Sequence, residues 1–216
     1  MTELLVRKTE DFVLTGRGDA PAWAAAPWVD LPRVGEGLAT YKTRVKTLYS
    51  HTGLYVLVDC EDKILTADMT RDYDKLFMQD VVEVFLWPDA SQRTYFEYEI
   101  SPLDVELPIM VINAEGPFHG WLPFGYEGSR RVRHATSVRG GERKPFANID
   151  GWVCEMCIPF GLLVGLKNVP PTSGATWRGN IYRIDYDAPA VTQWAWCPDT
   201  GGNFHDYKKF GTLTFE

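Results

Sequence analysis

The stretch Trp177–Phe215 constrains the fold more than any other part of the chain, because bulky aromatic and polar side chains alternate along it. Two extended segments joined by a loop carry the pattern, which reads Trp177-Arg-Gly-Asn180-Ile-Tyr-Arg183-Ile-Asp185, then Trp194-Ala-Trp196-Cys-Pro198, then Asn203-Phe-His205, and finally Phe210-Gly-Thr-Leu-Thr-Phe215. Side chains of an extended chain point alternately to opposite faces. Asn180 therefore lies on one face of the first predicted strand and Arg183 on the other.

These polar side chains predict a binding site for a sugar. Asn180 and Arg183 have apolar neighbours in the sequence, so they need hydrogen-bond partners from other side chains or from a ligand. Planar amide and guanidinium donors suit sugar hydroxyls, and the rings of Trp194 and Trp196 suit sugar C–H faces. The alternative is structural: a salt-bridge network around Arg183, tryptophans that belong to the core, and a His205 that bonds a loop carbonyl.

The rest of the chain is typical of an all-β protein. We expect strands at 40–49, 54–60, 81–87, 95–101, 130–139 and 152–158, a long loop at 102–128 that walls or covers the site, and one short helix within 159–166. An aromatic content of 13%, with 14 prolines and 19 glycines, favours short strands over long helices. The prediction is an antiparallel β-sandwich of jelly-roll or immunoglobulin-like type, forming a single domain over residues 1–216.

Three glutamates on two neighbouring predicted strands form a second polar group. Glu83 alternates with valines in 81–87, and Glu97 and Glu99 alternate with aromatic residues in 95–101. One face of each strand is then core, and the other carries acids beside aromatic rings. We interpret the second face as a binding face, with an inter-strand salt-bridge network as the alternative.

The order of four motifs resembles the carbohydrate-binding family 9-like proteins. The motifs are W-R-x-N-x-x-R-x-D with W-x-W-x-P and F-H-x-x-x-x-F-G-x-L-x-F at the C-terminus, Gln79-Asp80-Val-Val-Glu83-Val-Phe85, Tyr95-Phe-Glu97-Tyr-Glu99-Ile-Ser-Pro102, and Gly151-Trp152-Val-Cys-Glu155-Met-Cys-Ile-Pro159. Proteins of this family are β-sandwiches related to xylan- and cellulose-binding modules and, more distantly, to DOMON domains. The resemblance implies a non-catalytic domain of polysaccharide metabolism.

The resemblance also implies which residues bind the ligand. Family 9 modules hold a sugar end in a slot between aromatic rings, with arginine, asparagine and acidic side chains on its hydroxyls, and several bind calcium. The positions that match the motifs, and that we expect to bind a mono- or oligosaccharide, are Glu83, Glu97, Glu99, Asn180, Arg183, Trp196 and His205. The alternative function is a carbohydrate-active hydrolase, lyase or isomerase.

In that alternative, Glu97 and Glu99 are the catalytic acids. Their Cα atoms lie about 6.5–7 Å apart along an extended strand, within the range over which two carboxyl groups share acid and base work. Arg183 nearby would keep one carboxyl ionised, and an apolar wall such as Trp87 or Trp196 would raise the pKa of the other.

Charge and composition restrict the partners. A net charge of −7 and a pI of 5.2 oppose binding to nucleic acid, which needs a cationic surface. No window has the apolar length of a membrane span. The acid-rich segment 61–74 suits a hard cation such as calcium, with solvated loop acids as the alternative.

The start of the chain and its cysteines predict the compartment. The first residues, Met-Thr-Glu-Leu-Leu-Val-Arg-Lys, do not read as a signal peptide, so we expect a cytoplasmic protein from this sequence, or a secreted one if a leader has been removed. The spacing of the four cysteines does not match a metal site, and Cys154 and Cys157 would face opposite sides of one strand. We expect free buried thiols in a reducing compartment.

Overall fold

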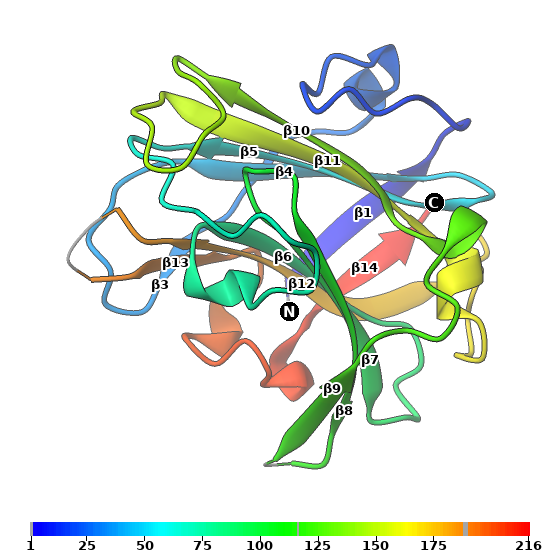
Figure 1. Cartoon of the computed structure of the whole chain (residues 1–216). Helices are drawn as coiled ribbons and strands as arrows, with labels where there is room; N and C mark the ends of the chain where they lie inside the picture. The colour runs from blue at the N-terminus through cyan, green and yellow to red at the C-terminus, as the bar shows by residue number, and fades with distance from the viewer. Residues whose placement is uncertain (1, 116, 188–189) are drawn as a thin grey trace.

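Two β-sheets lie face to face in the computed structural model, which describes residues 2–115, 117–187 and 190–216 (Figure 1). The strands are β1 (Glu3–Lys8), β2 (Val29–Asp30), β3 (Arg33–Val34), β4 (Thr43–Tyr49), β5 (Gly53–Glu61), β6 (Val81–Trp87), β7 (Thr94–Ile100), β8 (Glu106–Asn113), β9 (Phe118–Trp121), β10 (Arg133–Arg139), β11 (Gly151–Pro159), β12 (Thr176–Asp185), β13 (Thr192–Ala195) and β14 (Gly211–Phe215). Short 3-10 turns connect them: η1 (Pro21–Ala25), η2 (Leu76–Met78), η3 (Gly128–Arg130), η4 (Phe160–Leu163), η5 (Pro198–Thr200) and η6 (Tyr207–Lys209).

The strand order defines an upper and a lower sheet. The upper sheet runs β10-β11-β5-β4, and the lower sheet runs β14-β12-β6-β7-β8-β9, with β13 paired to β12. Strand β1 connects the two, because Glu3–Val6 pair with β14 and Arg7–Lys8 pair with β4. The sandwich prediction is confirmed, and most strand pairs are antiparallel. The two pairs made by β1 are parallel.

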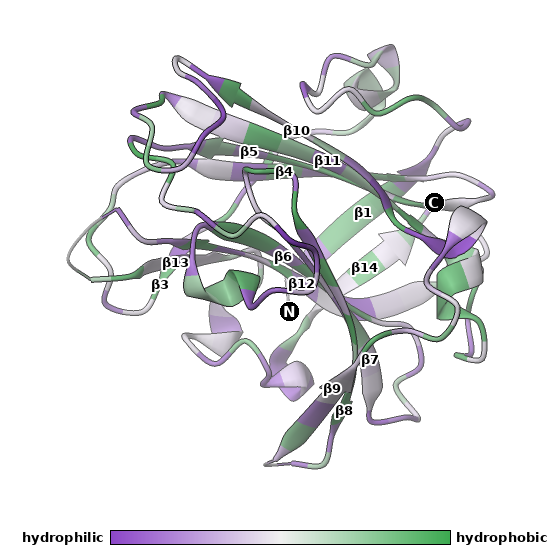
Figure 2. Ribbon diagram, in the orientation of Figure 1, coloured by the Kyte–Doolittle hydropathy of each residue, from purple (hydrophilic) through white to green (hydrophobic). Residues whose placement is uncertain are grey.

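The core between the sheets follows from the alternation of side chains. Val82 and Val84 of β6 and Tyr98 of β7 point inward and meet Val56 and Val58 of β5. Figure 2 shows hydrophobic residues along the strands that face each other across this layer. The alternate residues of the same strands point to the outer faces of the sandwich.

Each outer face is partly covered by a terminal segment. The C-terminal segment packs Phe204 and Phe210 on Phe85 and Tyr182 of the lower sheet. The N-terminal segment packs on the upper sheet, where buried Glu155 accepts hydrogen bonds from the Trp23 indole at 2.6 Å and from the Thr15 amide at 2.8 Å. Glu155 therefore anchors a covering segment.

The region 102–128 differs from the prediction, because it contains the hairpin of β8 and β9 in addition to loop. Proline cannot donate to a ladder and is therefore restricted to edges or bulges of a sheet. In the structure Pro108 pairs with Tyr98 of β7, and β9 covers only Met110–Asn113. Pro108 thus lies in a part of β8 that is an edge, where the missing N–H breaks no ladder.

The remaining local predictions are close to the structure. The short helix within 159–166 is the 3-10 turn η4, and no α-helix occurs among the described residues. Cys154 faces the inter-sheet core and Cys157 the outer face, and all four cysteines are buried thiols. In the part of the chain that the structure describes, no helix is long and apolar enough to cross a membrane.

Candidate functional site

The candidate site is a cavity of about 440 Å³ on the outer face of the lower sheet, which we call the acidic slot. Its floor is formed by Glu83 of β6 and by Glu97 and Glu99 of β7. Its walls come from β12, β13, the hairpin of β8 and β9, loops and the C-terminal segment. They consist of Phe77, Ile109, Val111, Phe118, Gly120, Ile184, Tyr186, Gln193, Gly202, Asn203, Phe204 and His205. The structure thus brings together four of the residues predicted from the sequence: Glu83, Glu97, Glu99 and His205.

The register of the lower sheet places the three glutamates side by side. Glu83 lies directly opposite Glu99, and Glu97 lies opposite Phe85. Directly opposite residues of an antiparallel pair have Cβ atoms about 4.5–5.5 Å apart. The acids therefore form one cluster on the outer face, while the valines between them fill the inter-sheet core.

The three carboxyl groups are buried, at 2%, 5% and 0% exposure for Glu83, Glu97 and Glu99. Burial raises the pKa of each group, because a buried carboxylate loses its hydration. The pKa of Glu97 rises to about 7. The charges of Glu83 and Glu97 add to the effect of burial on Glu99, whose pKa is raised further above its usual range. The cluster holds protons at neutral pH.

Glu99 has no basic side chain beside it among the described residues that line the slot. Both of its carboxylate oxygens are buried without a hydrogen-bond partner among the described residues. The groups that act on its pKa include the Glu97 carboxyl, with which it can share a hydrogen bond only when one of the two carries a proton, and the backbone N–H of Phe77. The described residues that line the slot also include no lysine and no arginine. Acceptors in the slot are therefore left for a ligand.

Two exposed phenylalanines supply aromatic surface to the slot. Phe77 is 44% exposed and Phe118 is 46% exposed, and both line the cavity. Phe118 stacks on the His205 ring with 3.8 Å between centroids. The sequence prediction missed both residues as ligand contacts, because they lie on a turn and in a hairpin far apart in the chain. The signal that would have found Phe118 is its place in the region expected to wall the site.

His205 forms a neutral wall. Its Nδ1 lies 2.7 Å from the Tyr95 hydroxyl, and the Asn113 amide donates to its backbone carbonyl at 2.8 Å. Burial lowers the pKa of His205 to about 4, so the ring is neutral at physiological pH. His205 therefore adds no positive charge to the three glutamates.

A second hollow of about 500 Å³ adjoins the slot. It shares Phe118, Asn203 and His205 with the slot and extends to Glu115 and Lys208. The stacked pair of Phe118 and His205 therefore borders both spaces. This arrangement leaves room for a ligand longer than one sugar ring.

Asn180 and Trp196 do not reach the slot. The Asn180 amide donates to the Cys197 carbonyl at 2.9 Å and accepts from the Cys197 amide at 2.8 Å, so it fixes the course of the C-terminal segment. Trp196 is 2% exposed and belongs to the inter-sheet core together with Trp194. Asn180 and Trp196 therefore do not line the slot, and both tryptophans point into the core.

Arg183 lies on the opposite side of the sheet from the slot. Its guanidinium contacts Asp185 at 2.6 Å and Asp62 at 3.1 Å, and it lies over the Trp194 ring at 4.7 Å. The side chain is fully buried. Alternation along β12 dictates this position, since Ile184 lines the slot and its neighbour must point away. Arg183 therefore cannot hold Glu97 or Glu99 ionised, as the catalytic alternative assumed.

The acid-rich segment contributes Asp62 to a cluster with Asp185 and Asp187, whose oxygens lie within 4.8 Å of one another. Arg183 already contacts two of these acids, and Asp187 accepts hydrogen bonds from the Thr66 hydroxyl at 2.9 Å and the Ile64 amide at 3.0 Å. Calcium needs about six to eight free oxygen ligands. These residues do not fit calcium as they stand, because their oxygens are already used. Nearby, Asp80 anchors two segments, because it accepts hydrogen bonds from the Thr66 and Tyr186 amides at 2.6 and 2.9 Å.

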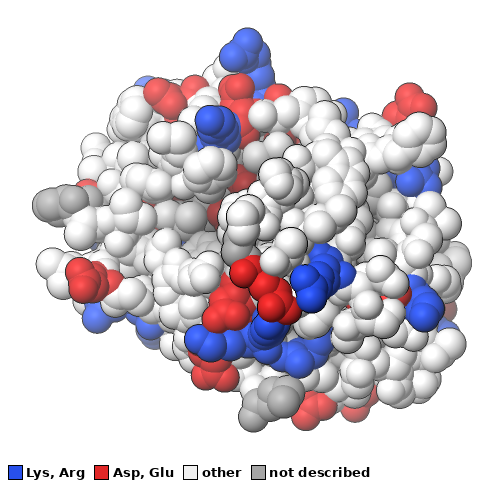
Figure 3. Space-filling model, turned by 90° about the horizontal axis from the view of Figure 1, so that it is seen from below, with Lys and Arg blue, Asp and Glu red and all other residues white. Residues whose placement is uncertain are grey.

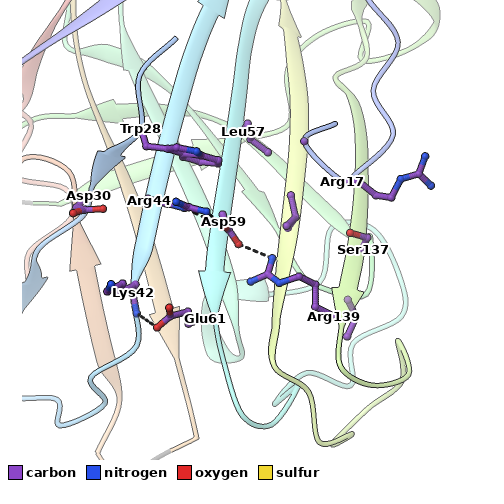
Figure 4. A pocket seen from close by; sticks show the side chains of 13 residues that line it. Arg17, Trp28, Asp30, Lys42, Arg44, Leu57, Asp59, Glu61, Ser137 and Arg139 are labelled. Carbon is purple, nitrogen blue, oxygen red and sulfur yellow. Dashed lines mark hydrogen bonds and ion pairs between the residues drawn. The ribbon is translucent and has the colours of Figure 1, made fainter. Parts of the chain in front are cut away.

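A larger hollow of about 880 Å³ lies on the outer face of the upper sheet, beside the N-terminal segment (Figure 4). Its charged groups contact one another: Asp59 accepts from Arg44 at 2.8 Å and from Arg139 at 2.6 Å. The Arg44 guanidinium lies 4.2 Å from the centre of the Trp28 ring, so one face of this ring is covered. Asp59 in this hollow is thus paired with two arginines, unlike the glutamates of the acidic slot.

A two-sheet sandwich with an aromatic-rimmed polar slot on one outer face defines a β-sandwich ligand-binding domain. The chain belongs to the family described as carbohydrate family 9 binding domain-like, whose profile matches residues 14–216. No curated protein matches the sequence.

Solved structures share the fold at low sequence identity. A candidate carbohydrate-binding protein from Bacteroides uniformis is 18% identical with a TM-score of 0.79, covering 100% of this chain and 99% of the other. A family 9 carbohydrate-binding module from Caldicellulosiruptor kristjanssonii in complex with cellotriose is 17% identical with a TM-score of 0.70, covering 99% and 93%. The module from the same organism in complex with glucose is 17% identical with a TM-score of 0.69, covering 99% and 95%.

Proposed function

We propose that this protein binds a mono- or oligosaccharide in the acidic slot. The observation that carries the proposal is the buried carboxyl group of Glu99, whose oxygens lack a hydrogen-bond partner, beside Glu83 and Glu97 on the floor of a cavity with exposed phenylalanines. Sugar hydroxyls are donors that can reach such acceptors, and sugar C–H faces pack on aromatic rings. Family membership and the sugar complexes of two related folds support the same ligand class.

The expected affinity is modest. Stacking on one ring contributes about 1 kcal/mol beyond the buried area. Hydrogen bonds to charged groups contribute about 1.5–3 kcal/mol each. A few such contacts, less the cost of immobilising the ligand, give micromolar to millimolar dissociation constants.

A glycan array followed by calorimetry tests the proposal. Phe118→Ala should weaken binding of any sugar that the array identifies by about tenfold. The variant loses the stacking free energy of roughly 1 kcal/mol and, in addition, the free energy of burying the ring against the sugar. The matched control is Phe124→Ala, because Phe124 is 92% exposed and does not line the slot. The proposal fails if no carbohydrate binds, or if both variants bind as the original protein does.

Trp28→Ala distinguishes the slot from the larger hollow. Trp28 lines the hollow of the upper sheet and lies on the opposite side of the sandwich from the slot. We expect unchanged sugar binding in this variant. Loss of binding there, with full binding in Phe118→Ala, would move the site to the upper sheet.

Catalysis is the second candidate function, because a carboxyl with a pKa of about 7 lies beside another carboxyl on one strand. Glu97 could protonate a leaving group near neutral pH. A partner carboxylate would have to stay ionised, and the described lining residues offer no cation that stabilises it. We therefore place binding before catalysis.

A further inference from the structure

The acidic slot contains three glutamates and, among the described residues that line it, no lysine or arginine. Glu83, Glu97 and Glu99 are all buried in it, whereas other buried acids of this protein have partners. Asp62 and Asp185 pair with Arg183, and Glu106 contacts Arg131 at 2.6 Å. Burying a carboxylate without a partner is costly, and burying three together is more so. The slot is therefore a place where a positively charged group is missing.

The walls do not supply that charge. The titratable groups around the three glutamates are Tyr95, Tyr182, Tyr186 and His205, and His205 is neutral. Just outside the slot, Lys208 contacts Glu115 at 3.1 Å and Lys209 contacts Asp206 at 3.0 Å. Figure 3 shows acidic and basic side chains gathered together on the side of the molecule seen from below. The nearby cations are thus already paired with surface acids.

We propose that the acidic slot selects a sugar that carries a protonated amino group, that is, an unacetylated amino sugar of the hexosamine type. This inference rests on the proposed function, since it names the class of carbohydrate that the same slot takes.

The chemistry of an ammonium group matches the floor of the slot. An ammonium group has three N–H donors and one positive charge, whereas a hydroxyl has one donor and no charge. Glu83 and Glu99 are opposite residues whose Cβ atoms lie about 4.5–5.5 Å apart, so one nitrogen can lie between their carboxyl groups. The two oxygens of Glu99 that lack partners would then accept charge-assisted hydrogen bonds.

The same arrangement disfavours other sugars. A neutral hexose can donate hydroxyls to the slot, but it brings no charge that would stabilise the ionised form of the glutamates. An N-acetylated amino sugar loses the charge and brings a bulkier amide to the same place. A uronic acid adds a carboxylate to three others and is repelled. The slot thus distinguishes sugars by charge as well as by shape.

Calorimetry with four monosaccharides near neutral pH tests the inference: glucosamine, glucose, N-acetylglucosamine and glucuronate. We expect glucosamine to bind at least about tenfold more tightly than the neutral sugars, from one added charge-assisted hydrogen bond. Glucuronate should bind least. Binding of glucosamine should also release protons from the glutamates, seen as a dependence of the measured heat on the ionisation enthalpy of the buffer. Glucose should release none.

Variants that change the charge of a side chain but keep its size show which of the two properties selects the sugar. Glu99→Gln keeps the size of the side chain and removes its charge, so it should weaken glucosamine binding more than glucose binding and abolish the preference for glucosamine. The control is Glu127→Gln, which removes a charge from an exposed residue outside the slot and should keep the preference.

The outcomes distinguish the inference from the proposed function. If glucose and glucosamine bind equally, or if Glu99→Gln retains the preference, the inference is overturned while sugar binding stands. If no sugar binds on the array or in calorimetry, both fail. If a simple alkylamine binds as tightly as glucosamine, the slot is a general ammonium site and the inference of an amino sugar is overturned.

Discussion

Glu83 on β6 lies directly opposite Glu99 on β7, so two buried carboxyl groups occupy one cross-strand pair of the lower sheet. Like charges in this position destabilise a sheet. The pair is relieved in the free protein by proton uptake, since burial raises the pKa of both groups. A protein that keeps such a pair gives up stability at a place where a ligand can restore it.

The first prediction concerns the pH dependence of stability. The pKa of Glu97 is about 7 when folded, against an ordinary value of 4.5, so between these values the folded state keeps a proton that the unfolded state releases. The contribution of Glu97 to the free energy of unfolding therefore falls as pH rises through this window. Urea denaturation of the original protein and of Glu97→Gln should show the variant gaining relative stability from about pH 4.5 to about pH 7. A constant difference between the two curves would contradict the shift.

The second prediction concerns Arg183. Replacing it with methionine leaves Asp62 and Asp185 buried without their cation, and breaking a buried pair costs about 3–5 kcal/mol. Denaturant titration should show this loss in Arg183→Met, and little change in Arg71→Met, whose side chain is 83% exposed. Sugar binding by the folded fraction should stay unchanged, because Arg183 faces away from the slot. Loss of binding with normal stability would place Arg183 in the ligand site after all.

The third prediction concerns Trp196. Trp196→Ala removes a ring that is 2% exposed, and such core truncations cost about 3–5 kcal/mol. The matched control is Trp121→Ala, since Trp121 is 44% exposed on β9. Thermal denaturation should show a large decrease in melting temperature only for Trp196→Ala. If Trp196→Ala has normal stability but fails to bind sugar, the result would support the contact between Trp196 and the ligand that the sequence predicts.

The fourth prediction concerns chemistry. Incubation of the purified protein with a panel of glycosides should give no product, because no described lining residue holds a second carboxyl ionised. Glu97→Gln and Glu99→Gln are assayed beside the original protein as controls, and both should be as inactive as it is. Product that disappears in both variants would establish catalysis and reject simple binding.

The sequence pattern determined which side chains share one face of each strand in this protein. Period-two alternation along 81–87 and 95–101 was enough to place Glu83, Glu97 and Glu99 together, since side-chain direction in a strand is a local property of the backbone. The same rule separated Asn180 from Arg183. The sandwich itself also follows from local pattern, because strands with one apolar face must cover it with another sheet.

Only the tertiary structure decided which polar residues face a ligand. Alternation along a strand does not tell which of its two faces is covered by other segments. Arg183 is enclosed by Asp62, which directly follows β5 and lies far from Arg183 in the sequence. The slot is likewise completed by Phe77 and Phe118, which come from separate connections. Such contacts depend on how distant segments pack, and the free energy of that packing is not encoded in any short stretch of sequence.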